Sequence, residues 1–180
     1  MLLENAKRFA MEAHAGQLRK STGTPMIEHP IRVAETLREF GFNEEVVAAG
    51  FLHDTVEDTD VTIEDIEQEF GEEVARIVAG NTENKEHSWE ERKQHTIDWV
   101  KQAPIEIKAL IVADKLDNLN SLMEAYKTQG DGVWRHFKRG KEKQGWYFSG
   151  VALNSTYGLG EEEIPDFFKE FIEKVNRFWS

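Results

Sequence analysis

The stretch from residue 50 to 59, Gly-Phe-Leu-His-Asp-Thr-Val-Glu-Asp-Thr, constrains the fold most, because it joins an apolar run directly to ionisable side chains. His53 and Glu57 are four residues apart, as are Asp54 and Asp58, so on a helix each pair lies on adjoining turns of one face. The apolar run places these four groups against the core of the protein. A carboxylate in such a place is costly unless it is paired, hydrogen-bonded or bound to a metal.

Imidazole and carboxylate groups together suit a divalent cation of the Mn, Fe, Co or Zn type. Glu57 and Asp58, one turn further on, could activate a water molecule beside that cation. A His-Asp pair alone, however, is more often a surface pair than a pair of metal ligands. A metal site needs further ligands from other helices, so the interpretation depends on the rest of the chain.

Length and composition exclude several classes of protein. A chain of 180 residues suits one domain, and the lack of cysteine rules out disulfides and thiolate metal sites. A formal net charge of -12 argues against a nucleic-acid partner, because such proteins bind phosphates largely through Lys and Arg. No apolar run approaches the roughly 18 residues of a membrane span, and the first residues do not resemble a signal peptide. We therefore expect a soluble cytoplasmic protein without a membrane partner.

Apolar residues recur at helical spacing along the whole chain, and no segment shows the alternation typical of strands. Turn residues and capping signals divide this pattern into helices, including capping boxes that begin at Thr62 and Ser88. The sequence thus predicts an all-α fold, a single-domain helical bundle over residues 1–180. Its chemical motifs fall within 17–121, and helices within 130–180 complete the domain.

Asp114 lies inside the most apolar of the predicted helices, where an unpaired acid would be heavily desolvated. A buried salt bridge would explain it as well as a metal would. Asn118 lies one turn later on the same face, and Ser121 follows at helical spacing. His29 opens an earlier helix, and taken alone it suits a surface or capping position.

Three segments, in this order, resemble the HD superfamily of metal-dependent phosphohydrolases, and within it the small, Mesh1-like alarmone hydrolases of RelA/SpoT type. They are Gln-Leu-Arg-Lys-Ser-Thr-Gly-Thr-Pro-Met-Ile-Glu-His-Pro at 17–30, the stretch 50–59, and Ala-Asp-Lys-Leu-Asp-Asn-Leu at 113–119. The resemblance covers about the first 125 residues. It implies an HD-type helical domain and an enzyme that removes the 3′-pyrophosphate from guanosine 3′,5′-bispyrophosphate (ppGpp or pppGpp).

The resemblance also implies roles for the matching residues. One metal, manganese in that family, would be held by four ligands, and two acids would position and deprotonate the attacking water. Four protein ligands leave open positions only on a five- or six-coordinate ion, which favours manganese or a similar ion over tetrahedral zinc. The implied ligands are His29, His53, Asp54 and Asp114, and the implied catalytic acids are Glu57 and Asp58.

Substrate contacts are implied at several further positions. Arg19 would pack near the base, and Lys85 falls where the family often has a basic residue near phosphate. Asn118 and Ser121 would lie near the ribose. The family commonly has Arg where this chain has Asn120, so one basic contact would be missing or replaced.

Two basic stretches could bind the distant phosphates of such a substrate. The loop before His29 is one residue longer than in the long enzymes of the family, which leaves the register of Arg19 and Lys20 open. A second basic run lies at 135–143, and from it we predict that Lys141 and Lys143 contact substrate. The alternative is that this run is a solvated helix face, as most charge runs are.

Two other functions compete with the alarmone hydrolase. An HD phosphohydrolase could act on another nucleotide, such as an adenosine alarmone or the 2′-phosphate of NADPH. A metal-stabilised module could instead sense a nucleotide without turning it over, although the presence of Glu57 and Asp58 favours an enzyme. All of these take a small-molecule nucleotide as partner, and the sequence leaves the oligomeric state open.

Overall fold

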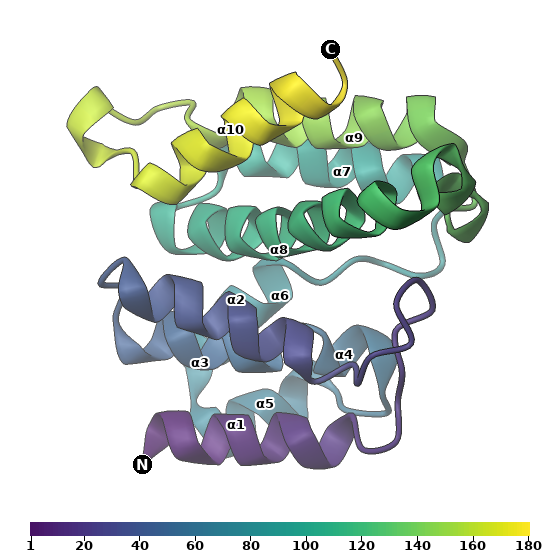
Figure 1. The fold of residues 1–180 in the computed structure, drawn as a ribbon. Helices are drawn as coiled ribbons and strands as arrows, with labels where there is room; N and C mark the ends of the chain where they lie inside the picture. The colour runs from purple at the N-terminus through teal and green to yellow at the C-terminus, as the bar shows by residue number, and fades with distance from the viewer.

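The computed structural model describes residues 1–180 and consists of helices joined by turns and loops (Figure 1). The predicted all-α fold is confirmed, since the only β pairing is one isolated bridge between Leu18 and Pro25. None of the helices is long and apolar enough to cross a membrane. The helices are α1 (Leu2–Ala13), α2 (Glu28–Glu39), α3 (Glu44–Leu52), α4 (Thr55–Asp58), α5 (Ile63–Phe70), α6 (Glu72–Gly80), α7 (Trp89–Gln102), α8 (Ile105–Gln129), α9 (Gly140–Ser155) and α10 (Asp166–Phe178), with 3-10 helices η1 (Gly130–His136) and η2 (Glu161–Glu163).

Helix α8 runs through the middle of the molecule, with α1 to α6 on one side and α7, α9 and α10 on the other (Figure 1). It can occupy this place because its side chains are apolar on several faces, with Leu110, Ile111 and Leu119 fully buried. Helices α2 and α3 pack on one side of α8, and α9 and α10 pack on the other. Any side chain near the middle of α8 is therefore close to elements from both halves of the chain.

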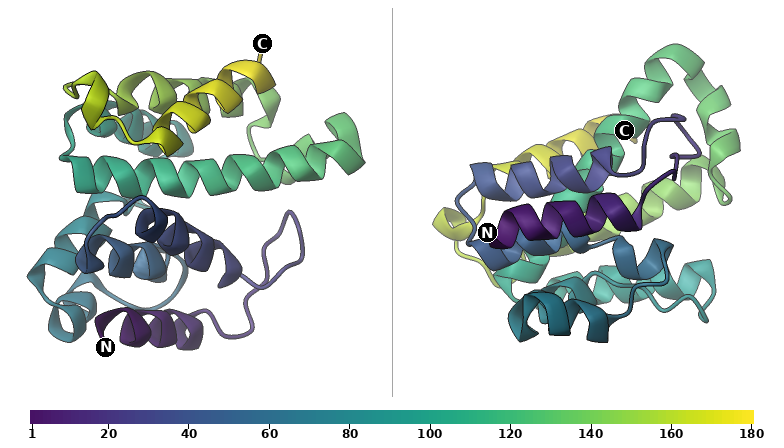
Figure 2. Two further views of the ribbon diagram at one scale, coloured as in Figure 1. Left: turned by 60° about the vertical axis from the view of Figure 1, so that its left-hand side comes forward. Right: turned by 90° about the horizontal axis from the view of Figure 1, so that it is seen from below.

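The loop between α1 and α2 extends beside the C-terminal end of α8 and η1 in both views of Figure 2. Arg19 anchors this loop, because its guanidinium donates to Ser121 Oγ at 3.1 Å and to Asn118 Oδ1 at 2.9 Å, both on α8. The loop thus brings Arg19 and Lys20, the first basic stretch of the sequence, close to the family-like segment 113–119.

The helix starts predicted from the capping boxes at Thr62 and Ser88 are confirmed. Thr62 and Ser88 begin α5 and α7 as capping boxes, and in each the acid three residues later accepts a hydrogen bond from the backbone amide of the capping residue. Asn43 caps α3, with its side chain accepting from the Val46 amide at 3.1 Å. In the second basic run, η1 ends at His136 and α9 begins at Gly140.

The central stretch departs from the continuous helix that the spacing predicted, because α3 ends at Leu52 and α4 begins at Thr55. At this break, side chains form hydrogen bonds with backbone carbonyl groups: His53 Nδ1 bonds Gly50 O at 2.7 Å, and Thr55 Oγ1 donates to Leu52 O at 2.7 Å. The His53–Asp54 turn that results lies against the core, since His53 is only 1% exposed.

Candidate metal centre and active site

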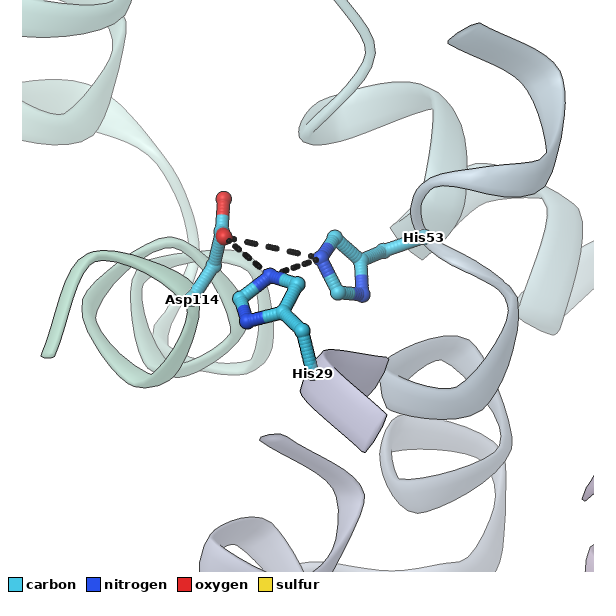
Figure 3. Close-up of side chains that lie close together, drawn as sticks. All are labelled: His29, His53 and Asp114. Atoms are coloured by element: carbon cyan, nitrogen blue, oxygen red, sulfur yellow. Dashed lines mark hydrogen bonds and ion pairs between the residues drawn. The ribbon is translucent and has the colours of Figure 1, made fainter. Parts of the chain in front are cut away.

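The side chains of His29, His53 and Asp114 meet in the core, from α2, the α3–α4 turn and the middle of α8 (Figure 3). His29 Nε2 lies 3.0 Å from Asp114 Oδ1 and 3.2 Å from His53 Nε2. His53 Nε2 lies 3.5 Å from the same Asp114 oxygen. The structure thus brings together three of the four predicted ligands within one small cluster.

Asp54, the fourth predicted ligand, adjoins both histidines. Its Oδ1 lies 3.3 Å from His53 Nε2, and its Oδ2 lies 3.6 Å from His29 Nε2. Atoms that share one ion through bonds of about 2.1 Å cannot be more than about 4.2 Å apart, and each of these distances meets that condition. Two imidazoles and two carboxylates are also a chemically suitable set for a divalent transition metal.

Both imidazoles are held in the orientation that a metal ligand needs. The Nδ1 atom of His29 bonds Asp117 Oδ2 at 2.6 Å, and that of His53 bonds Gly50 O at 2.7 Å. Because these acceptors fix the proton on Nδ1, the neutral ring presents the lone pair of Nε2 to the site. The residues present therefore fit a divalent cation.

The electrostatics of the cluster also favour positive charge. Burial opposes a charged imidazole, yet the carboxylates of Asp54 and Asp114 raise the pKa of His53 to about 10 when no cation is bound. A divalent cation would satisfy the same carboxylates and displace those protons.

A second layer of residues supports the ligands. Arg32 donates two hydrogen bonds to Asp117, from Nε to Oδ1 at 2.8 Å and from Nη2 to Oδ2 at 3.1 Å. Although burial opposes its ionisation, hydrogen bonds from His29 and Arg32 hold the pKa of Asp117 below its ordinary value. Asp117 was not among the predicted site residues, yet its position three residues after Asp114, on the same face of a helix, was a signal for it.

Asp114 forms both of the arrangements that its sequence position suggested. Its Oδ2 accepts from Lys115 Nζ at 2.9 Å and from Asn81 Nδ2 at 3.4 Å, and its Oδ1 accepts from Asn118 Nδ2 at 3.1 Å. Burial opposes its charge, but Lys115 and His53 hold the pKa of Asp114 well below its ordinary range. The buried salt bridge thus coexists with the ligand geometry.

Glu57 and Asp58, the predicted catalytic acids, line the same pocket as three of the predicted ligands, His29, Asp54 and Asp114. Burial raises the pKa of Glu57 to about 7, against a hydrogen bond that it accepts from the Glu83 amide. Asp58 lies at the open rim, where partial burial and the charge of Asp54 raise its pKa. A carboxylate that titrates near neutral pH is well suited to accept a proton from water.

Two pockets adjoin at this site. The metal-side pocket, of about 200 Å³, is almost wholly polar, whereas half of the residues lining the second pocket, of about 270 Å³, are hydrophobic. The second pocket includes Trp89, Phe137, Tyr147 and Phe148. Four residues line both pockets and so mark their junction: Arg19, Lys93, Lys115 and Asn118.

The two lysines at the junction were missed by the sequence analysis. Lys93 Nζ pairs with Glu83 Oε1 at 2.7 Å, and only 13% of the Lys115 side chain is exposed. Burial and the charge of Lys115 lower the pKa of Lys93. Lys115 stands inside the third motif, but Lys93 lies in a highly charged helix that gives no signal. Tyr147 is buried and also lines the second pocket, where its hydroxyl has no hydrogen-bond partner.

The predicted substrate contacts fall into two groups. Arg19, Asn118 and Ser121 meet at the junction and in the second pocket, whereas Lys20 lines a separate hollow of about 470 Å³ beside Asp58 and His136. Three other predicted residues are exposed and line neither of the two adjoining pockets: Lys85, Lys141 and Lys143.

Asn120, where the family commonly has Arg, does not line either pocket. Its side chain accepts from Lys174 Nζ on α10 at 2.7 Å. Asparagine at this position therefore leaves the two pockets intact, and its contact is with the C-terminal helix.

Comparison with known proteins agrees with this geometry. The HD domain family matches residues 6–139. This chain belongs to the HD domain family. The predicted resemblance to alarmone hydrolases is confirmed too, because this HD-family chain is 44% identical to the guanosine-3′,5′-bis(diphosphate) 3′-pyrophosphohydrolase MESH1 of Mus musculus, over 94% of this chain and 93% of that protein.

Other relatives of this HD-family chain are much longer than it is. It is 42% identical to a probable guanosine-3′,5′-bis(diphosphate) 3′-pyrophosphohydrolase of Synechocystis over 63% of this chain, but spans only 16% of that protein. Among solved structures, a protein of Listeria monocytogenes is 54% identical with a TM-score of 0.81, over 84% of this chain and 98% of that one. A metazoan ortholog of SpoT that hydrolyzes ppGpp has a TM-score of 0.80 at 26% identity, over 98% of this chain and 94% of that one.

Proposed function

We propose that this chain is a metal-dependent hydrolase that removes the 3′-pyrophosphate from guanosine 3′,5′-bispyrophosphate. The observation that carries the proposal is the pair of adjoining pockets, one with the ligand cluster and Glu57 and the other lined by aromatic side chains. The first suits a phosphate group and the second suits a nucleoside. The printed names of the relatives support guanosine 3′,5′-bispyrophosphate as the nucleotide.

The metal in this proposal is manganese or a similar ion, held by His29, His53, Asp54 and Asp114. When bound, such an ion polarises a phosphate oxygen and lowers the pKa of a coordinated water. Two imidazoles and two carboxylates suit an ion with more than four positions, because water and substrate then have places of their own.

Glu57 is the proposed general base. Water attacks the phosphorus attached to the 3′ oxygen, Glu57 accepts its proton, and the 3′ oxygen leaves and takes up a proton to become a hydroxyl. The products are pyrophosphate and the 5′-diphosphate of guanosine. Burial raises the pKa of Glu57 to about 7 without a cation, and a bound cation would lower it again, so Glu57 is ionised near neutral pH and can accept the proton. Asp58, at the rim, would help to orient the water.

Lys93 and Lys115 are the proposed partners of the phosphate charge. They lie at the junction of the two pockets. A substrate with its 3′-pyrophosphate in the metal-side pocket and its nucleoside in the second pocket must cross this junction. Fixed cations there stabilise charge that moves onto phosphate oxygens during bond cleavage. Their present carboxylate partners, Glu83 and Asp114, hold both ammonium groups in place before substrate arrives.

The second pocket would hold the guanosine. Tyr147 and Phe148 offer aromatic surface for the base, and Gln144, Asn118 and Ser121 offer hydrogen-bonding groups for the base edge and ribose. The unpaired, buried hydroxyl of Tyr147 is one such group, since a polar atom without a partner gains most from a ligand that supplies one.

The 5′-pyrophosphate would extend toward the hollow that Arg19, Lys20 and His136 line. This hollow lies beside the junction, because Arg19 also lines both pockets. Lys141 and Lys143 were predicted to contact substrate, but they are exposed on α9 and line neither adjoining pocket, so the contribution proposed for them is longer-range attraction.

A turnover screen with manganese tests the proposal. Purified protein is incubated with guanosine 3′,5′-bispyrophosphate, its adenosine counterpart and NADPH, and the products are separated by anion-exchange chromatography. We expect pyrophosphate and the guanosine 5′-diphosphate, with Glu57→Gln as the inactive control. Hydrolysis of only the adenosine compound or NADPH would overturn the choice of substrate, and binding of all three without turnover would indicate a sensing module.

A further inference from the structure

His14 is a buried histidine that lies outside the metal cluster, and the proposed mechanism gives it no role. It follows the end of α1 and is 2% exposed. Its Nδ1 lies 2.9 Å from Gln17 Oε1, and Gln17 Nε2 lies 3.0 Å from the backbone carbonyl of Asp58. Two bonds therefore connect α1 with the last residue of α4.

The donor and the acceptor of each hydrogen bond between His14, Gln17 and Asp58 follow from the chemistry of the groups. A backbone carbonyl only accepts, so the Gln17 amide nitrogen donates to Asp58 and its oxygen faces His14. That oxygen also only accepts, so His14 must donate from Nδ1. The proton of neutral His14 thus lies on Nδ1, and its buried Nε2 has no hydrogen-bond partner.

Histidine is a costly residue for this place if it serves packing alone. An unsatisfied buried polar atom destabilises the folded protein, and an apolar side chain of similar size would avoid that cost. The feature that an apolar side chain could not provide is the bond from Nδ1 to Gln17.

The hydrogen bond from Gln17 is made to the last residue of α4, a helix that needs support from outside itself. Helix α4 has four residues, which is a single turn, and so short a helix is unstable by itself. The amide of Thr62, which would continue the helix onto the Asp58 carbonyl, bonds Asp65 Oδ2 at 2.9 Å instead. Gln17 therefore satisfies a terminal carbonyl that the helix leaves free.

We propose that His14 is a positioning residue, which fixes the α4 turn through Gln17 and thereby aims Glu57 and Asp58 at the metal-side pocket. The inference rests on the proposed function in one respect, since it takes those two acids as the groups that act on water. It assigns a role to His14 and Gln17, namely to hold the stretch 50–59 in place.

Kinetics of matched variants test the inference. Gln17→Met keeps the length of the side chain without its two bonds, and His14→Phe fills the space without a donor. We expect each to lower kcat by roughly 10- to 100-fold, as small misplacements of reacting groups do, with KM and manganese content unchanged. His14→Asn, whose amide nitrogen lies where Nδ1 does, should recover most of kcat. A double variant should be no worse than either single one, because both break one connection.

Three results would overturn the inference: unchanged kcat in Gln17→Met, equal loss in His14→Asn and His14→Phe, or a loss in KM alone. A merely structural histidine would lower Tm in all variants without the recovery by asparagine. If the nucleotide screen identifies another substrate, the same ratios are measured on that substrate.

Nuclear magnetic resonance separates this inference from the proposed function. In the chelator-treated protein, the ¹⁵N shifts of His14 should report a protonated Nδ1, and Gln17→Met should move the amide signals of Glu57 and Asp58. A proton on Nε2, or unmoved signals, would refute the connection even if the enzyme is active. The expected spectrum in a protein that hydrolyses no nucleotide would leave the connection intact and refute the proposed function alone.

Discussion

His29 Nε2 and Asp114 Oδ1 lie 3.0 Å apart although 85 positions separate the two residues in the chain. The contact exists because α2 packs on α8, and because Asp117, one turn after Asp114, bonds the far side of the same imidazole. One helix thus supplies both a ligand and the residue that orients another ligand, so the site and the packing of α2 on α8 depend on each other.

Removal of a ligand should remove the metal. We expect wild-type protein to carry about one divalent ion per chain, and His53→Ala to lose both the ion and activity, because the ligands form a single site. Metal content by plasma mass spectrometry and turnover with added manganese are the measurements. His87→Ala, at an exposed histidine, is the control. Full activity in His53→Ala or in chelator-treated protein would exclude the metal assignment.

Loss of Asp117 should weaken the metal site without removing a ligand. Asp117→Ala frees the His29 ring from its orienting bond and leaves Arg32 without its carboxylate. Residues in such supporting positions typically contribute roughly 10–100-fold to metal affinity, and we expect a loss of that size. Competition with a fluorescent chelator measures it. An affinity equal to that of an exposed control, Glu124→Ala, would show that the bond to His29 is dispensable.

Glu57→Gln should separate binding from chemistry. The amide is nearly the same shape and still accepts from the Glu83 amide, but it cannot take a proton. We expect turnover to fall by roughly 10²–10⁴-fold while metal and substrate affinity persist. Steady-state kinetics with isothermal titration on the same samples would show this. Turnover at the wild-type level would make Glu57 a structural residue.

The pH dependence of wild-type turnover follows from the same residue. Burial raises the pKa of Glu57 to about 7, and a bound cation lowers it again because it favours the carboxylate. As the pH falls through the pKa of Glu57 in the metal-bound protein, which lies below the metal-free value of about 7, Glu57 gains its proton, so kcat should decrease toward acid pH. A kcat profile from pH 5 to 9 is the check, and a rise toward acid pH would contradict the role of Glu57 as base.

Glu57 should also destabilise the chelator-treated protein at high pH. Its pKa is about 7 in the folded state against 4.5 for the ordinary group, so between these values only the folded state holds the proton. Folding stability therefore falls as pH rises through this window. Glu57→Gln has no such proton, and we expect it to be about 1–3 kcal/mol more stable than wild type at pH 8 and nearly equal at pH 4.5. Urea unfolding at both values measures this, and a difference independent of pH would refute it.

The two basic stretches should differ in their effect on substrate binding. Lys20 lines the hollow beside Asp58, whereas Lys141 and Lys143 are exposed and line none of the adjoining pockets. We expect Lys20→Ala to raise KM severalfold, and Lys141→Ala with Lys143→Ala to raise it less and only at low ionic strength, where screening is weak. Little change in kcat is expected. Equal KM in all variants would make both stretches solvated surface.

Local sequence signals predicted much of the fold and the site, because they depend on spacing within one helix. The caps at Thr62 and Ser88 are of this kind, and so is the four-residue spacing of Asp114 and Asn118. The match of three ordered segments to a known family supplied the grouping of His29 with the other ligands, which spacing alone did not give.

Other features could not be predicted because they depend on packing between distant helices. Lys93 reaches the junction only because α7 lies against α9 beside the metal-side pocket, and nothing in its charged helix marks it. The break between α3 and α4 arises from side-chain bonds to the Gly50 and Leu52 carbonyls, which compete with the helix pattern. The exposed position of Lys141 and Lys143 likewise depends on which face of α9 packs against its neighbours.

Hydrolysis of guanosine 3′,5′-bispyrophosphate in ¹⁸O-labelled water tests the central claim most directly, because it reports which atom the water attacks. With manganese bound, we expect one ¹⁸O atom in the released pyrophosphate and none in the guanosine 5′-diphosphate, as attack on the 3′ phosphorus requires. Label in the ribose hydroxyl of the guanosine product, or no turnover by fully metal-loaded protein, would contradict the account.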